Sequence, residues 1–199
     1  MDFSGLTMVD LAGLVANHLS VHNIDVVLVG GLAVEIYSHN LYLTKDIDMV
    51  NINYTPAKAL QQAMAEIGFY KQGRVYINET TDISIEFPSS PLSVGDEIIT
   101  KTTTVPSGKG TVPILTVNDV VKDRLAAFIH WGDNQSLVQA TAVMLKHGLG
   151  PNEFKTYIQR EGTLDHFALL ESLHKTADST HITMLGLEKN LTDLIIQQL

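Results

Sequence analysis

Residues 27–50, VLVGGLAVEIYSHNLYLTKDIDMV, carry the clearest pattern of secondary structure in this chain. This stretch begins inside a short apolar run at 25–29, which is typical of a buried strand. A pair of glycines ends this strand, and the next residues, 32–38, are predicted to form a helix at once. A second strand is expected at 45–50. A strand, a glycine turn, a helix and a strand in this order indicate an α/β unit.

Along the whole chain, the spacing of apolar residues changes once. Short strand patterns mix with helices up to residue 115, and the periodicity is helical beyond it. We therefore predict an α+β fold, with a mixed sheet and flanking helices in residues 1–115 and a C-terminal helical region in residues 116–199. In the first part we expect helices at 8–22 and 55–67 and further strands at 69–71, 74–78, 82–87, 98–105 and 112–115. In the second part we expect helices at 117–130, 134–147, 151–161, 164–177 and 182–198.

Two carboxylates stand on the second strand of this unit. Side chains alternate along a strand, so Asp46 and Asp48 point to the same side, and the apolar residues around them indicate a buried opposite face. Mg²⁺ prefers oxygen ligands of this kind. The strand at 82–87 offers a third acid, Asp82 or Glu86, at the same parity. We favour Glu86, because an acid between two apolar residues needs a partner more than an acid beside a loop does.

The glycine pair adds a feature that suits phosphate. Gly30 and Gly31 allow the backbone to approach a ligand closely, and the N–H groups at the start of the following helix are available to bind an anion. Alone, a glycine pair is most often a tight turn, and an Asp-x-Asp pair is most often a solvated strand face. The order of strand, glycine turn, helix and acid pair indicates a metal and nucleotide site.

The composition narrows the classes of function. The chain has 199 residues, a formal net charge of -9 and no cysteine, so disulfides and zinc–thiolate sites are excluded. The acidic balance disfavours broad nucleic-acid binding. No apolar stretch approaches the roughly 20 residues that span a bilayer, and the N-terminal segment is acidic where a signal peptide is basic. We expect a cytoplasmic protein without a membrane partner. The eight histidines show no evident ligand spacing, and we interpret them as surface or helix-end residues.

The ordered set of motifs resembles the nucleotidyltransferase superfamily, in particular its minimal members and the AbiEii-type toxin branch. The resemblance is carried by the stretch 27–50, by ISIEFPSSPLSVGDE at 83–97 and by LTVNDVVKDRLAAFIHWGDNQSLVQATAVM at 115–144. The signature of that superfamily is a Gly-Gly or Gly-Ser turn, a helix, an acid–apolar–acid strand and a later single acid. It implies that the chain adopts a nucleotidyltransferase-like fold.

The resemblance also implies roles for individual residues. Gly30 and Gly31 would contact the triphosphate of an NTP such as ATP, and Asp46 and Asp48 would hold two Mg²⁺ ions. Glu86 would hold the ion that activates the acceptor hydroxyl, or act as the base. Further phosphate contacts are expected from Thr44, Lys45 and Lys122.

The function so implied is transfer of a nucleoside monophosphate from NTP to a hydroxyl on a protein, an RNA end or a small molecule. An antitoxin or a second copy of the chain would be its partner. The alternative is a nucleotide-binding or partner-docking protein without catalysis. It is favoured by Gly31 where serine is frequent, Tyr42 where the toxin branch often has arginine, and Glu86 where aspartate is usual. A glycosyltransferase ranks last, because only one strand precedes the acid pair.

Overall fold

A computed structural model describes residues 1–177 and 182–197 of the chain. The chain forms two compact units, which we describe separately. The first comprises Met1–Ala33, Leu43–Ser93 and Glu97–Thr116. The second comprises Val34–Tyr42, Val94–Asp96 and the chain from Val117 onward. The predicted α+β class is confirmed, because a mixed sheet and a set of helices make up the described residues.

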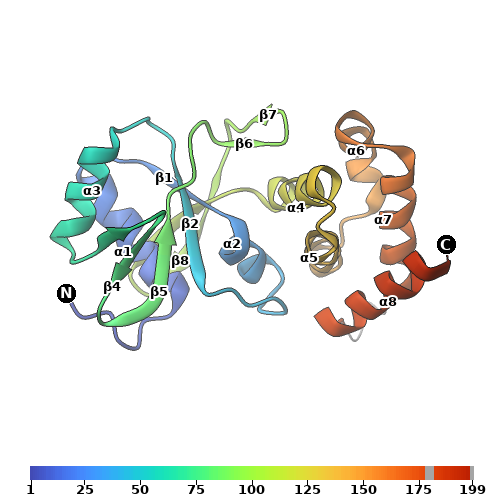
Figure 1. Ribbon diagram of the computed structural model, residues 1–199, viewed down its shortest axis with the longest axis horizontal. Coiled ribbons are helices and arrows are strands. Elements are labelled where there is room, and N and C mark those ends of the chain that lie inside the picture. Colours follow the sequence, from blue (N-terminus) through green and yellow to red (C-terminus); the bar gives the residue numbers. More distant parts are fainter. Residues whose placement is uncertain (178–181, 198–199) are drawn as a thin grey trace. The chain divides into compact units, whose positions relative to one another are not determined.

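The first unit contains one mixed sheet with the strand order β3-β4-β5-β2-β1-β9-β8 (Figure 1). At its centre β1 pairs antiparallel with β2 and parallel with β9, and β2 pairs parallel with β5. The strands are β1 (Val26–Val29), β2 (Asp46–Asn51), β3 (Tyr70–Gln72), β4 (Val75–Asn78), β5 (Thr81–Glu86), β8 (Thr103–Ser107) and β9 (Gly110–Ile114). Two short strands, β6 (Ser93–Val94) and β7 (Glu97–Ile98), pair with each other in a separate two-stranded sheet.

The core of the first unit lies between this sheet and its helices. Helix α1 (Met8–Val21) packs against β9 and β1, and helix α3 (Ala57–Glu66) packs against α1. The Thr7 side chain caps α1 by accepting a hydrogen bond from the N–H of Asp10. The helix and strand residues that fill this core are fully buried, among them Leu11, Val15, Leu19, Leu28, Ile47 and Met49.

Three of the predicted helices and strands have different boundaries in the structure. Helix α2 (Gly30–Tyr37) includes both glycines instead of starting after them. The predicted strand at 98–105 starts only at Thr103, and its hairpin turns more tightly than expected, since Ser107 pairs with Gly110 across a two-residue loop. The predicted helix at 151–161 is divided into a 3-10 turn, η1 (Pro151–Phe154), and the helix α6 (Lys155–Glu161).

The second unit consists mainly of helices and includes the end of α2. Its other helices are α4 (Val117–Trp131), α5 (Asn134–His147), α7 (Leu164–Thr176) and α8 (Met184–Gln197). Segment 34–42 contacts helix α5 of this unit, where Nε2 of His147 lies 2.9 Å from the Tyr37 carbonyl oxygen. No helix in the described part of the chain is both long and apolar enough to cross a membrane.

A buried carboxylate ties the other segment to these helices. The Glu161 side chain is 2% exposed and accepts hydrogen bonds from the Asp96 N–H, His130 and Arg160. Burial raises the pKa of Glu161, but these bonds and the Arg160 charge outweigh it and hold that pKa below its usual range. The ionised carboxylate thus holds segment 94–96 against α6.

Leu28 offers a test of how much the central strand contributes to stability. It is fully buried in β1 between β2 and β9, so Leu28→Ala leaves a cavity and should lower the free energy of unfolding by about 2–5 kcal/mol. Leu43→Ala is the matched control, because Leu43 is exposed; its effect should stay within about 0.5 kcal/mol. Urea unfolding measures both. Equal effects of the two substitutions would contradict this packing.

Candidate functional site

The acid pair lies at the start of β2, with its two members on one side of the strand. Asp46 is exposed and Asp48 half-buried, whereas the intervening Ile47 and the following Met49 are fully buried. Alternation along the strand therefore separates a polar side from an apolar side, as the sequence predicted. The acids can bind a ligand from the polar side while the apolar side chains anchor the strand in the core.

The strand register brings the favoured third acid next to this pair. Strand β5 runs parallel to β2, with Asp48 opposite Glu86 and Asp46 opposite Ser84. Directly opposite residues of a pair point to the same face of the sheet, so Glu86 shares the side of the two aspartates. Asp82 is exposed and lies one pleat before Ser84, beyond the start of β2. The register therefore favours Glu86 over Asp82 as the neighbour of the pair.

Glu86 is engaged by a residue that the sequence analysis did not single out. Nε and one terminal nitrogen of Arg74 donate to Oε1 of Glu86 at 3.1 and 2.9 Å. The Arg74 side chain is 87% exposed and that of Glu86 24% exposed. Val75, next to Arg74 in the sequence, pairs with Glu86 across β4 and β5, and this register brings Arg74 beside the acid.

The three acids do not form a closed metal cage. Within residues 1–177 and 182–197, the one trio of acids and histidines with ligand atoms all within 4.8 Å of one another lies elsewhere. Asp46, Asp48 and Glu86 would need side-chain rotation to share an ion, and Glu86 would have to leave Arg74. An exposed ion pair contributes only about 0–1 kcal/mol, so this release costs little.

The glycine turn lies directly against Asp48 and Thr44. Gly30 has φ +63°, and a Cβ at this position would lie 2.3 Å from Oδ2 of Asp48. A Cβ on Gly31 would lie 2.7 Å from Oγ1 of Thr44. The same Thr44 oxygen donates to Oδ1 of Asp46 at 2.6 Å. The turn, the threonine and both acids are thus one contiguous group, with a helix beginning above it.

The glycine turn, Thr44 and the two aspartates have the chemistry to bind an anion and a cation side by side. The first N–H groups of α2 lack partners within the helix and are suited to phosphate. The oxygens of Thr44, Asp46 and Asp48 are hard donors of the type that Mg²⁺ prefers, so the residues present fit that ion. The exposed Lys45 is adjacent in sequence to Asp46.

Lys122 belongs to the second unit. It stands on α4, with its ammonium 5.5 Å from the centre of the Tyr157 ring. Its contact with phosphate, like that of Lys45, stays a prediction.

Replacing Gly30 by alanine tests the close approach of the Gly30 backbone to the Asp48 side chain. Gly30→Ala combines an unfavourable backbone conformation with a clash against the Asp48 carboxylate. Gly73 is a matched control, because its φ is +62° and nothing lies within 4 Å of its added Cβ. Gly73→Ala should cost about 1–2 kcal/mol from backbone strain alone. Gly30→Ala should cost clearly more in urea unfolding, and equal costs would contradict the contact.

The chain was compared with known proteins at the level of sequence. No protein-family model matches it, and no curated protein matches it.

Proposed function

We propose that this chain is a Mg²⁺-dependent nucleotidyltransferase that moves a nucleoside monophosphate from NTP to a hydroxyl acceptor. One observation carries the proposal: the Gly30-Gly31 turn packs against Asp48 and Thr44 at the first turn of a helix. This juxtaposition provides backbone donors for a triphosphate and carboxylates for its ions within one group.

Each residue of the group has a distinct task in the proposed reaction. Asp46 and Asp48 hold the ions, Thr44 orients the Asp46 carboxylate through its hydrogen bond, and the α2 N–H groups bind phosphate oxygens. Glu86, once released from Arg74, accepts the proton of the acceptor hydroxyl. Mg²⁺, when bound, acidifies that hydroxyl and offsets charge on the departing pyrophosphate.

The bond changes balance without a further reactant. The acceptor oxygen forms a bond to the α-phosphorus while the bond from that phosphorus to the bridging oxygen of the β-phosphate breaks. Pyrophosphate leaves with the electron pair, and the acceptor carries the nucleoside monophosphate. The protein contributes mainly position and charge, as is usual in transfers of this class. The acceptor would be a protein, an RNA end or a small molecule, and an antitoxin or a second copy of the chain would be the partner.

The ion pair between Arg74 and Glu86 favours a second candidate function. If Glu86 stays bound to Arg74, the third acid is unavailable as a base, and the chain would bind a nucleotide without transferring it. Binding and turnover therefore need separate measurements.

Calorimetric titration with each NTP, with and without Mg²⁺, measures the binding step. Wild type should bind an NTP only with Mg²⁺, and Asp46→Asn/Asp48→Asn should abolish that binding because the ions lose their ligands. The control is Glu79→Gln/Asp82→Asn, which removes two charges from exposed positions of the same unit and should bind like wild type. Absence of NTP binding, or equal binding by the double variant, would overturn the nucleotide site. Binding of a sugar nucleotide in place of any NTP would favour a glycosyltransferase.

Glu86→Gln separates transfer from binding. In the transferase, this variant should keep Mg²⁺-dependent NTP binding but release pyrophosphate about 10²–10⁴-fold more slowly, because a general base is lost. Pyrophosphate release with a mixture of candidate acceptors is the readout. Arg74→Ala frees Glu86 and should not slow the reaction. NTP binding without turnover in wild type and in both variants would identify the nucleotide-binding alternative.

A further inference from the structure

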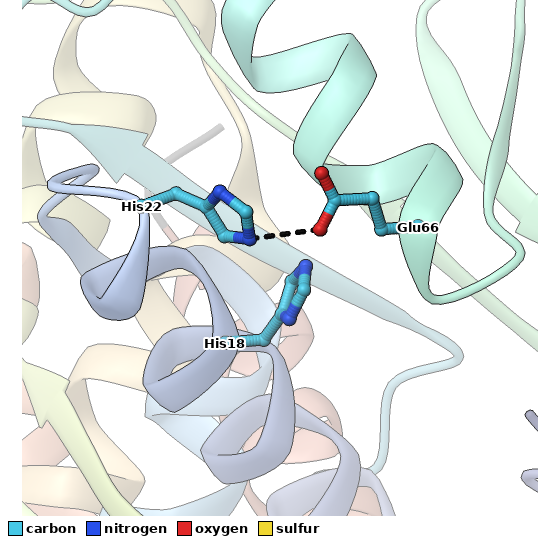
Figure 2. Close-up of side chains that lie close together, drawn as sticks. All are labelled: His18, His22 and Glu66. Carbon is cyan, nitrogen blue, oxygen red and sulfur yellow. Dashed lines mark ion pairs between the residues drawn. The ribbon is translucent and has the colours of Figure 1, made fainter.

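A second group of ligand side chains lies on the helices of the first unit. His18 lies in the last turn of α1, His22 is the C-cap residue four positions later, and Glu66 is the last residue of α3. Figure 2 shows both imidazole rings turned toward the Glu66 carboxylate, with the dashed line joining His22 and Glu66. Residues four apart lie on one face of a helix, so α1 presents both rings to α3. The sequence analysis overlooked this spacing among the histidines.

The distances are close to those of a metal site. One ligand atom from each of the three residues lies within 4.8 Å of the others, and Nε2 of His22 is 3.0 Å from Oε2 of Glu66. Around a tetrahedral ion with bonds of 2.0–2.1 Å, neighbouring ligand atoms are about 3.3 Å apart. The His22 and Glu66 side chains are 33% and 56% exposed, so small rotations can close the difference.

This group is separate from the acid pair. The chain passes from His22 into β1 at Val26, whereas Asp48 pairs with Val29 at the other end of that strand. The two groups also differ in chemistry, since one offers oxygens alone and the other two imidazole nitrogens and a carboxylate. Imidazole suits Zn²⁺ and neighbouring transition ions, whereas Mg²⁺ prefers oxygen.

We propose that His18, His22 and Glu66 form a Zn²⁺ site that links α1 to α3. The three side chains fill three positions of a tetrahedron and leave the fourth for water, the open arrangement also found in catalytic zinc sites. Without the ion, His22 and Glu66 form an ion pair, and Nε2 of His18 lies 2.7 Å from the Ala63 carbonyl oxygen. Coordination through Nε2 of His18 would replace this hydrogen bond to Ala63, whereas coordination through Nδ1 would leave it in place. The site does not depend on the proposed transfer reaction.

Calorimetric titration of the full chain with ZnCl₂, in excess Mg²⁺ to occupy the acid pair, tests the site. One Zn²⁺ should bind wild type and raise its Tm, since the ion binds the folded state. His22→Gln and Glu66→Gln should each weaken Zn²⁺ binding by at least about tenfold. Removing even a residue that only hydrogen-bonds to a metal ligand lowers metal affinity by about that factor, and these substitutions remove a ligand itself. In both variants, the Zn²⁺-induced rise in Tm should also disappear.

Two controls make the result specific. His130→Gln removes another histidine paired with a carboxylate, since Nε2 of His130 lies 3.1 Å from Oε2 of Glu161, and should leave Zn²⁺ binding unchanged. Asp46→Asn/Asp48→Asn should also bind one Zn²⁺ with wild-type affinity. Absence of saturable binding, equal binding by His22→Gln, or loss of binding in the aspartate variant would each overturn the proposal. The last outcome would assign the ion to the acid pair instead.

Discussion

The close approach of Gly30 to the Asp48 carboxylate is the constraint on which the candidate site depends. Strand β1 ends at Val29, which pairs with Asp48, so the chain has to turn directly above the acid. Only a residue without a Cβ can do so at φ +63°, because an added Cβ would lie 2.3 Å from Oδ2. The same turn starts α2, so the first turn of that helix lies next to Asp48.

Hydrogen bonds hold the acids in place in the absence of an ion. Thr44 donates to Asp46, and Arg74 binds Glu86 from an exposed position. A buried partner would oppose release strongly, but an exposed ion pair contributes little stability. The arrangement is thus compatible with two states of Glu86, one bound to Arg74 and one beside Asp48. The balance between them decides whether the group has a base as well as a binding site.

The two proposed ion sites can coexist in one unit because their ligands differ. The oxygens at the start of β2 suit a hard ion that keeps waters and phosphate in its shell. The imidazoles at the end of α1 suit a softer ion with fewer ligands. The site on α1 and α3 would join two helices, whereas the acid pair stands on the sheet.

Features that depend on near neighbours along the chain could be predicted from the sequence. The alternation of side chains along a strand predicted that Asp46 and Asp48 point to the same side, and it left Asp82 and Glu86 as candidates for the third acid. The spacing of apolar residues predicted the helices and the α+β class. Contacts between distant segments became known only from the folded chain. These include the register of Asp48 with Glu86, the approach of Arg74 to Glu86, and the arrival of Glu66 beside His18 and His22. Such contacts depend on which strands pair and which helices pack, and side-chain burial over the whole unit selects those arrangements, so no local pattern encodes them.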